Sequence, residues 1–287
     1  MKNFILSSED GSELTAEQKK KFDISTLPMS FLLDGQEYSS KNTPLTMKEF
    51  CDKMRKGSST KTSQPNEFEV EEYLTELLKE GKDILHISMT SRMSGTYSNF
   101  KKVAERLNEN SDNKIYVVDS LCQSYGIAML MIYLRKLTEN QNLTAKEAFD
   151  LAEKIKLSIA HVFVVDDLKY LARGGRIPSY LAFIGNMLTL KPVLFVDDDG
   201  EIKQHHKVIG RKKSINDMVQ YFKENFSEKF NTVCISEADC KQDAECLKAK
   251  LLELNSNLEI EINSLGPVIT SHCGPNTLAL FFVAKKR

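Results

Sequence analysis

Two short hydroxyl-rich stretches stand where the sequence predicts the beginning of a helix. Residues 91–96 (SRMSGT) follow a predicted strand, and residues 61–65 (KTSQP) lead into a second helix. The first turn of a helix has unpaired N–H groups and about half a positive charge, so it favours an anion. Ser94 can bond a ligand oxygen and Gly95 lets a ligand approach the backbone, although spacing by itself favours Ser94 as a helix cap.

The second stretch allows the same two interpretations. Thr62 and Ser63 can bind a ligand, or they can cap the helix that begins near Pro65. The carboxyl ends of the strands of an open α/β sheet meet in one crevice, where such sheets bind ligands. We therefore expect the two stretches to converge, which favours ligand binding for both.

Two further motifs carry residues that could contact an anion. In residues 171–178 (LARGGRIP) the paired glycines permit a left-handed turn or a close contact, and Arg173 and Arg176 can meet an anion or a partner, or lie in solvent beyond a helix end. The motif lacks the pattern of a phosphate loop. In residues 271–276 (SHCGPN), His272 and Cys273 would point opposite ways on an extended chain. We expect a turn histidine that donates to a ligand or a carbonyl, not a Cys–His dyad.

The remaining titratable residues indicate neither a catalytic nor a metal site. The chain has no GxSxG motif and no pair of carboxylates set apart for acid–base chemistry. Its six cysteines form no CxxC pair, and the other histidines lack metal-ligand spacing, with His205 and His206 expected to be exposed in a hairpin. These residues therefore mark out no acid–base pair and no metal ligands, and we predict no metal and no cofactor.

Composition narrows the class of protein. Hydrophobic residues make up 41% of the 287 residues and charged residues 28%, with a formal net charge of −1, which gives no general attraction to nucleic acid. No apolar stretch approaches the roughly 18 residues that span a membrane, and the first apolar run is too short for a secretory signal. We expect a cytoplasmic protein with reduced thiols and no stable membrane insertion.

Strands and helices alternate through the first half of the chain, which predicts a parallel sheet. Residues 57–62 are expected to form a loop. The predicted strands are residues 2–7, 83–88 and 115–119. Three helices are expected to open with a capping box, whose threonines are Thr15, Thr46 and Thr144.

The second half differs, because a turn at Asp198-Asp199-Gly200 predicts a hairpin and hence a mixed sheet. The expected fold is α/β with two domains. Residues 1–160 form an N-terminal parallel-sheet domain that carries the hydroxyl-bearing loops, and residues 161–287 form a C-terminal domain with a mixed sheet.

A series of short blocks, taken in order, resembles the DegV family over nearly the whole chain. Each block is weak evidence, but their common order is specific. The blocks are TSQP (62–65), SGTY (94–97), DS (119–120), DLKYL (167–171), GGRI (174–177), LKP (190–192), GPVI (266–269) and HCGP (272–275).

The resemblance implies a non-catalytic protein with a long-chain fatty acid held between two α/β domains. Some family members are the fatty-acid-binding subunits of the bacterial fatty acid kinase, in which a separate kinase phosphorylates the carboxylate of the bound acid. In the family pattern the TSQP and SGT hydroxyls hold that carboxylate, and the histidine of the HxGP block lies near it. The carboxylate-binding residues implied for this chain are Thr62, Ser63, Ser94, Gly95, Thr96 and His272.

The acyl chain requires an apolar tunnel, for which the apolar residues of 180–195 and Phe281 are candidates. Two departures from the family pattern stand out. Asn276 replaces the usual glycine after HxGP, and Ile209 replaces an arginine of a basic stretch, a loss that bears on kinase docking more than on lipid binding. The arginines that remain as candidate contacts to a partner or a phosphate are Arg173, Arg176 and Arg211.

Two other functions fit the same residues. One is a serine-dependent acyl hydrolase or transferase with Ser94 or Cys273 as nucleophile, which would need a base near Ser94 that the sequence does not reveal. The other is a binding module for a different carboxylate. Extraction of the ligand from purified protein and a serine-reactive probe distinguish these functions from fatty-acid binding.

Overall fold

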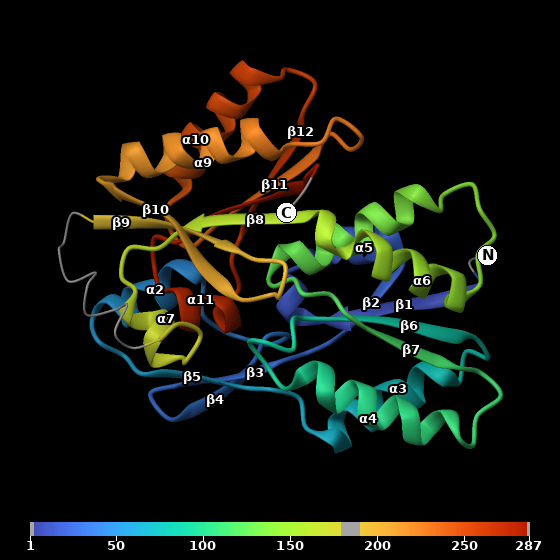
Figure 1. Cartoon of the computed structure of the whole chain (residues 1–287). Coiled ribbons are helices and arrows are strands. Elements are labelled where there is room, and N and C mark those ends of the chain that lie inside the picture. Colours follow the sequence, from blue (N-terminus) through green and yellow to red (C-terminus); the bar gives the residue numbers. More distant parts are fainter. Residues whose placement is uncertain (1–2, 179–189, 286–287) are drawn as a thin grey trace. The chain divides into compact units, whose positions relative to one another are not determined.

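The computed structural model describes residues 3–178 and 190–285, whose Cα atoms group into two compact units (Figure 1). The first unit is Met1–Ser30 with Ser63–Leu157, and the second is Phe31–Thr62 with Ser158–Arg287. The division at residue 157 lies close to the predicted boundary. Residues 31–62 differ from the prediction, which assigned them to the first domain, because they group with the second unit and take Thr62 with them.

The first unit is built on a four-stranded parallel sheet in the order β2-β1-β6-β7. The predicted parallel sheet is therefore confirmed. Every residue of β1 and all but one of β6 are buried, as expected for a sheet covered on both faces. The strands are β1 Phe4–Glu9, β2 Ile24–Leu27, β6 Asp83–Ser88 and β7 Ile115–Asp119.

Helices cover both faces of this sheet, with α3 and α4 on one face and α5 and α6 on the other (Figure 1). Val70 and Leu74 of α3 pack with Phe100 and Val103 of α4 in one buried cluster that includes Ile84 of β6. Each such side chain contributes about 1.5–3 kcal/mol by leaving water. The helices are α1 Ala16–Phe22, α3 Glu67–Leu78, α4 Thr96–Asn108, α5 Tyr125–Leu137 and α6 Ala145–Ile155, with short 3-10 turns η1 Asp10–Ser12 and η2 Lys156–Ser158.

Local sequence signals set the beginnings of several helices. The capping boxes predicted at Thr15, Thr46 and Thr144 are confirmed at α1, α2 (Met47–Arg55) and α6. A further capping box, formed by Asn66 and Glu69, opens α3 just after Pro65. A capping side chain of this kind contributes about 1 kcal/mol to helix stability.

The second unit contains a six-stranded mixed sheet in the order β10-β9-β8-β13-β11-β12. All neighbours are antiparallel except β11 and β12, so the predicted mixed sheet is confirmed. Helices α9 Arg211–Asn225 and α10 Lys241–Leu254 bury apolar residues against it. The strands are β8 Ile159–Val164, β9 Leu190–Val196, β10 Ile202–Ile209, β11 Thr232–Glu237, β12 Glu259–Ser264 and β13 Leu278–Val283.

Residues 31–62 join the second unit through specific contacts. Arg55 of α2 pairs with Asp239 at 2.5 Å, and Thr60 Oγ1 donates to the carbonyl of Ser271 at 3.3 Å. The segment forms most of a small sheet, β4-β3-β5, with β3 Ser30–Leu33, β4 Gln36–Ser39 and β5 Thr60–Ser63. The expected loop at residues 57–62 is therefore wrong in part, because Thr60–Thr62 belong to a strand. Two short helices complete this region, α7 Lys169–Arg173 and α11 Pro267–Cys273.

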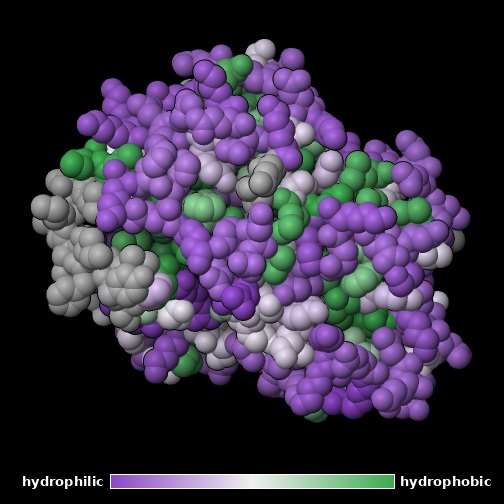
Figure 2. All heavy atoms as spheres, viewed as in Figure 1, coloured by the Kyte–Doolittle hydropathy of each residue, from purple (hydrophilic) through white to green (hydrophobic). Residues whose placement is uncertain are grey.

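One face of the molecule can be judged for its polarity in a space-filling view. Figure 2 shows that hydrophilic residues occupy most of the face in view. Among the described residues, the large hydrophobic side chains with the greatest exposure are Phe68 at 67% and Ile209 at 63%. None of the helices that could be traced combines the length and the apolar character needed to span a bilayer.

Candidate functional site

The first predicted stretch forms a tight turn at the beginning of α4. The Ser94 hydroxyl bonds the Thr96 hydroxyl at 2.8 Å and accepts from the Thr96 N–H at 3.2 Å. Thr96 is fully buried and Ser94 is half-buried. Ser94 thus bonds Thr96, the first residue of α4. The N-cap position itself is occupied by Gly95, which has no side chain to cap the helix. The turn offers two hydroxyl groups and the N-terminus of a 13-residue helix to an anion.

Gln64 connects the second stretch to this turn within the first unit. Its side-chain carbonyl accepts from the Gly95 N–H at 2.9 Å, and Asn99 Nδ2 donates to the Pro65 carbonyl at 2.8 Å. A Cβ atom at Gly95 would lie only 2.5 Å from Gln64 Oε1, so a glycine permits this approach. Ser63, by contrast, is exposed. The sequence did not single out Gln64, because its partner lies 31 residues further along the chain.

The second unit brings Thr62 to His272. Thr62 Oγ1 lies 2.7 Å from His272 Nε2, and His272 stands in the last turn of α11 rather than in the turn that the sequence predicted. The other ring nitrogen, Nδ1, is buried and has no hydrogen-bond partner among the described residues. Burial, together with the charge of Arg176, lowers the pKa of His272 to about 4. The ring is therefore neutral at pH 7 and can offer a nitrogen to a ligand.

The glycines of residues 171–178 allow α7 to approach this histidine. A Cβ atom at Gly174 would lie 2.4 Å from His272 Nδ1, and Gly175 has a φ of +75°. Both features predicted for the glycine pair, a close contact and a left-handed turn, are confirmed. Arg176 is half-buried and its guanidinium donates to the Gly174 carbonyl, whereas Arg173 is exposed and stacks over the ring of Tyr170 at 5.6 Å.

Comparison with known proteins identifies the family to which the chain belongs. A family model described as "Uncharacterised protein, DegV family" matches residues 10–285. The chain belongs to the DegV family. It is 35% identical to a DegV domain-containing protein of Clostridium perfringens over 99% of this chain and 98% of that protein. It is 30% identical to a DegV domain-containing protein of Streptococcus pyogenes over 98% of each.

Solved structures of the DegV family share the fold over the whole chain. A DegV lipid-binding protein from Thermotoga maritima matches with a TM-score of 0.83 at 26% identity, covering 100% of both chains. DegV from Bacillus subtilis, described as a fatty-acid-binding protein, matches with a TM-score of 0.83 at 25% identity, covering 99% of this chain and 100% of that one. The predicted family and fold class are both confirmed.

The two residues that depart from the DegV pattern, Asn276 and Ile209, are both described by the structure. Asn276 has a φ of 60°, a left-handed conformation that asparagine adopts more readily than most residues, so it can replace glycine there. Its side chain accepts from Arg55 at 2.9 Å and donates to Asp166 at 2.7 Å. Ile209 is the last residue of β10 and is exposed.

The remaining predicted residues are placed as follows. Arg211 donates to Asp243 at 2.8 Å and lies 3.9 Å from Asp166, so its charge is balanced within its own unit. Phe281 is buried in β13. Leu190 is the first residue of β9, and the other tunnel candidates, over 181–188, lie outside the described residues. Within the described ranges, one group of three side chains could hold a metal ion, and it belongs to β10 and α9 rather than to the loops above.

A buried polar cluster at the end of β1 was not predicted. Glu9 Oε1 accepts from the Met89 N–H at 2.6 Å, while His86 lies 3.2 Å from Glu9 Oε2 and 3.0 Å from the Ser7 hydroxyl. All three side chains are fully buried. Burial lowers the pKa of His86, while Glu9 opposes that shift. The cluster fastens β1 to β6 and to the loop that leads toward α4.

Proposed function

We propose that this chain binds a long-chain fatty acid and holds it by its carboxylate. The observation that carries the proposal is the pair formed by Thr62 and His272, which leaves a buried, neutral ring nitrogen without a partner among the described residues. An unpaired buried polar atom costs about 1–3 kcal/mol, which a ligand atom can recover. Support also comes from the relatives, since DegV structures are described as lipid-binding and fatty-acid-binding proteins.

The proposed carboxylate ligands are those implied by the family pattern, namely Thr62, Ser63, Ser94, Gly95, Thr96 and His272. Hydroxyl and N–H groups bond a carboxylate without a buried cation. The turn at α4 supplies such groups from Ser94 and Thr96. A carboxylate held in this way keeps its charge and stays available to a phosphoryl donor. Arg173, Arg176 and Arg211 remain the proposed contacts to a phosphate or a partner.

Most of the affinity would come from the acyl chain. Burial of about 14 methylene groups at about 0.8 kcal/mol each gives about 11 kcal/mol as an upper bound. The loss of translational and rotational freedom reduces this sum. The tail therefore supplies affinity, while the polar residues fix which end of the ligand is held.

We further propose that the chain is a carrier that works in the cytoplasm without a cofactor and presents the acid to a separate kinase for phospholipid synthesis. Ser94 supports a carrier over a hydrolase or transferase, because among the described residues of its unit its hydroxyl bonds only Thr96. Neither the hydroxyl nor the N–H of Thr96 can act as a general base, and a serine nucleophile needs a general base. A different carboxylate ligand is the remaining alternative.

The test is ligand extraction followed by a double substitution. Organic extraction and native mass spectrometry of purified protein should release a fatty acid, and stripped protein should take up palmitate or oleate. Thr62→Val with Ser94→Ala should weaken uptake at least about tenfold, because two hydrogen bonds to a charged group are lost. Thermal unfolding of the double variant should show an intact fold. An empty protein that takes up neither acid would refute the proposal, and labelling of Ser94 by a fluorophosphonate with turnover of acyl thioesters would favour the hydrolase.

A further inference from the structure

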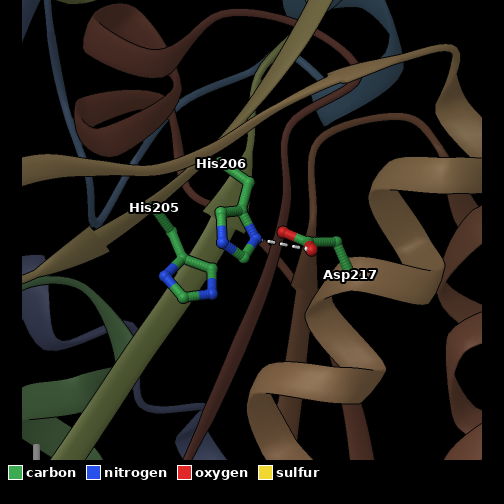
Figure 3. A group of neighbouring side chains, drawn as sticks. All are labelled: His205, His206 and Asp217. Atoms are coloured by element: carbon green, nitrogen blue, oxygen red, sulfur yellow. Dashed lines mark hydrogen bonds and ion pairs between the residues drawn. The ribbon is translucent and has the colours of Figure 1, made fainter.

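Two adjacent histidines in β10 lie on the same side of the strand. In a regular strand successive side chains point to opposite faces, so neighbours do not share a ligand. Here β10 pairs Gln204 with Leu194 and His206 with Val193, which leaves His205 as an extra residue in a β-bulge. A bulge re-aims the side chain that follows it. The centroids of the two imidazole rings consequently lie 3.9 Å apart. Figure 3 shows the two rings as neighbours.

An acidic residue of α9 faces these rings. Asp217 Oδ1 lies 2.8 Å from His206 Nδ1 (Figure 3), and the Asp217 side chain is 15% exposed. Its second oxygen, Oδ2, is buried and has no hydrogen-bond partner in the part of the chain that the structure describes. A buried carboxylate oxygen without a partner is costly, so a simple surface ion pair does not account for the arrangement.

The geometry points to a binding site for a divalent transition-metal ion such as Zn²⁺, with His205, His206 and Asp217 as ligands and water completing the coordination. One donor atom from each residue lies within 4.8 Å of the others. In a tetrahedral zinc site the donors lie about 3.4 Å apart, given bonds of about 2.0–2.2 Å. Small rotations of the exposed His206 and of Asp217 would therefore close the site around an ion.

The environment of His205 suits a metal ligand. Its ring packs edge-on against Tyr221 at 5.1 Å and against Phe195 at 6.1 Å, which limits its orientations. Two imidazoles and a carboxylate favour zinc and similar ions over Mg²⁺ or Ca²⁺, which prefer oxygen ligands throughout.

The experiment uses the full chain without a histidine tag, first treated with a chelator. Zn²⁺ is titrated in competition with a chromophoric indicator, and Co²⁺ is added separately for its absorption spectrum. We expect one Zn²⁺ per chain and a Co²⁺ spectrum typical of nitrogen and oxygen ligands. His206→Ala and Asp217→Asn should each weaken Zn²⁺ binding at least about tenfold, because loss of a supporting contact alone costs 10–100-fold.

A matched control separates this site from the thiols. Cys246 is the exposed cysteine among the six and lies in α10, so Cys246→Ser should leave the Zn²⁺ affinity unchanged. His206→Ala should keep the thermal midpoint of the metal-free wild-type chain within a few degrees, since His206 is exposed. Equal Zn²⁺ affinity in wild type and both site variants would overturn the proposal, as would loss of binding in Cys246→Ser.

Discussion

Gly174 offers a direct test of how His272 is held. The residue has an ordinary helical conformation, with φ −72° and ψ −11°, so alanine suits its backbone and would even favour the helix by up to about 1 kcal/mol. The added methyl group would nevertheless lie 2.4 Å from His272 Nδ1. Either α7 or the imidazole must move. Overpacking costs about 1–3 kcal/mol, and loss of the hydrogen bond between Thr62 and His272 costs about 0.5–1.5 kcal/mol.

We therefore expect Gly174→Ala to lower the free energy of unfolding by roughly 2 kcal/mol, the sum of these opposing effects. Gly175→Ala is the matched control, because its Cβ would meet no atom within 4 Å but its φ of +75° costs about 1–2 kcal/mol. Both variants lose similar stability in urea unfolding. Only Gly174→Ala should also lower the affinity for a fatty acid, by about tenfold. A displacement assay with a fluorescent fatty acid measures that affinity. The reasoning would be refuted if Gly174→Ala bound the fatty acid with wild-type affinity. It would also be refuted if Gly175→Ala lost as much affinity as Gly174→Ala.

Two further predictions concern buried polar groups. The pKa of His272 falls from its ordinary 6.5 to about 4 on folding, so below pH 6.5 the unfolded chain binds a proton that the folded chain does not. The free energy of unfolding should then fall by up to about 1.4 kcal/mol per pH unit between pH 6.5 and about 4, and urea unfolding of His272→Gln should show a smaller slope than wild type. Glu9→Gln should lower the free energy of unfolding at pH 7 by about 1–3 kcal/mol, because the Met89 N–H loses a charged acceptor; an unchanged urea midpoint would contradict this.

The elements that local signals specify could be predicted from the sequence. Each capping box is complete within four residues, so the first residue of the helix that it opens can be predicted from the local sequence. The alternation of strands and helices likewise identified the parallel sheet. The grouping of residues 31–62 could not be predicted in this way, because it depends on contacts such as Arg55 with Asp239, which are 184 residues apart.

The candidate site shows the same limit. Thr62, Ser94 and His272 are predicted as carboxylate ligands because each stands in a short block that resembles the DegV pattern. Their supporting contacts are long-range: the Thr62 and His272 side chains are 210 residues apart in sequence, and Gly174 meets a ring almost a hundred residues later. Sequence spacing says nothing about such pairs. The carboxylate-binding role of these residues stays a prediction.

The two histidines of β10 show how one irregularity changes the chemistry that a sequence predicts. With period-two alternation, His205 and His206 would face opposite sides, and neither would have a second imidazole near it. The bulge at His205 alters that periodicity by one residue, so both rings reach the side where α9 presents Asp217. Bulges have only weak sequence signals, since any residue type can occupy the extra position when its backbone stays in an allowed region. A metal ion bound there would join β10 to α9 and should raise the free energy of unfolding in proportion to the logarithm of its concentration above the dissociation constant.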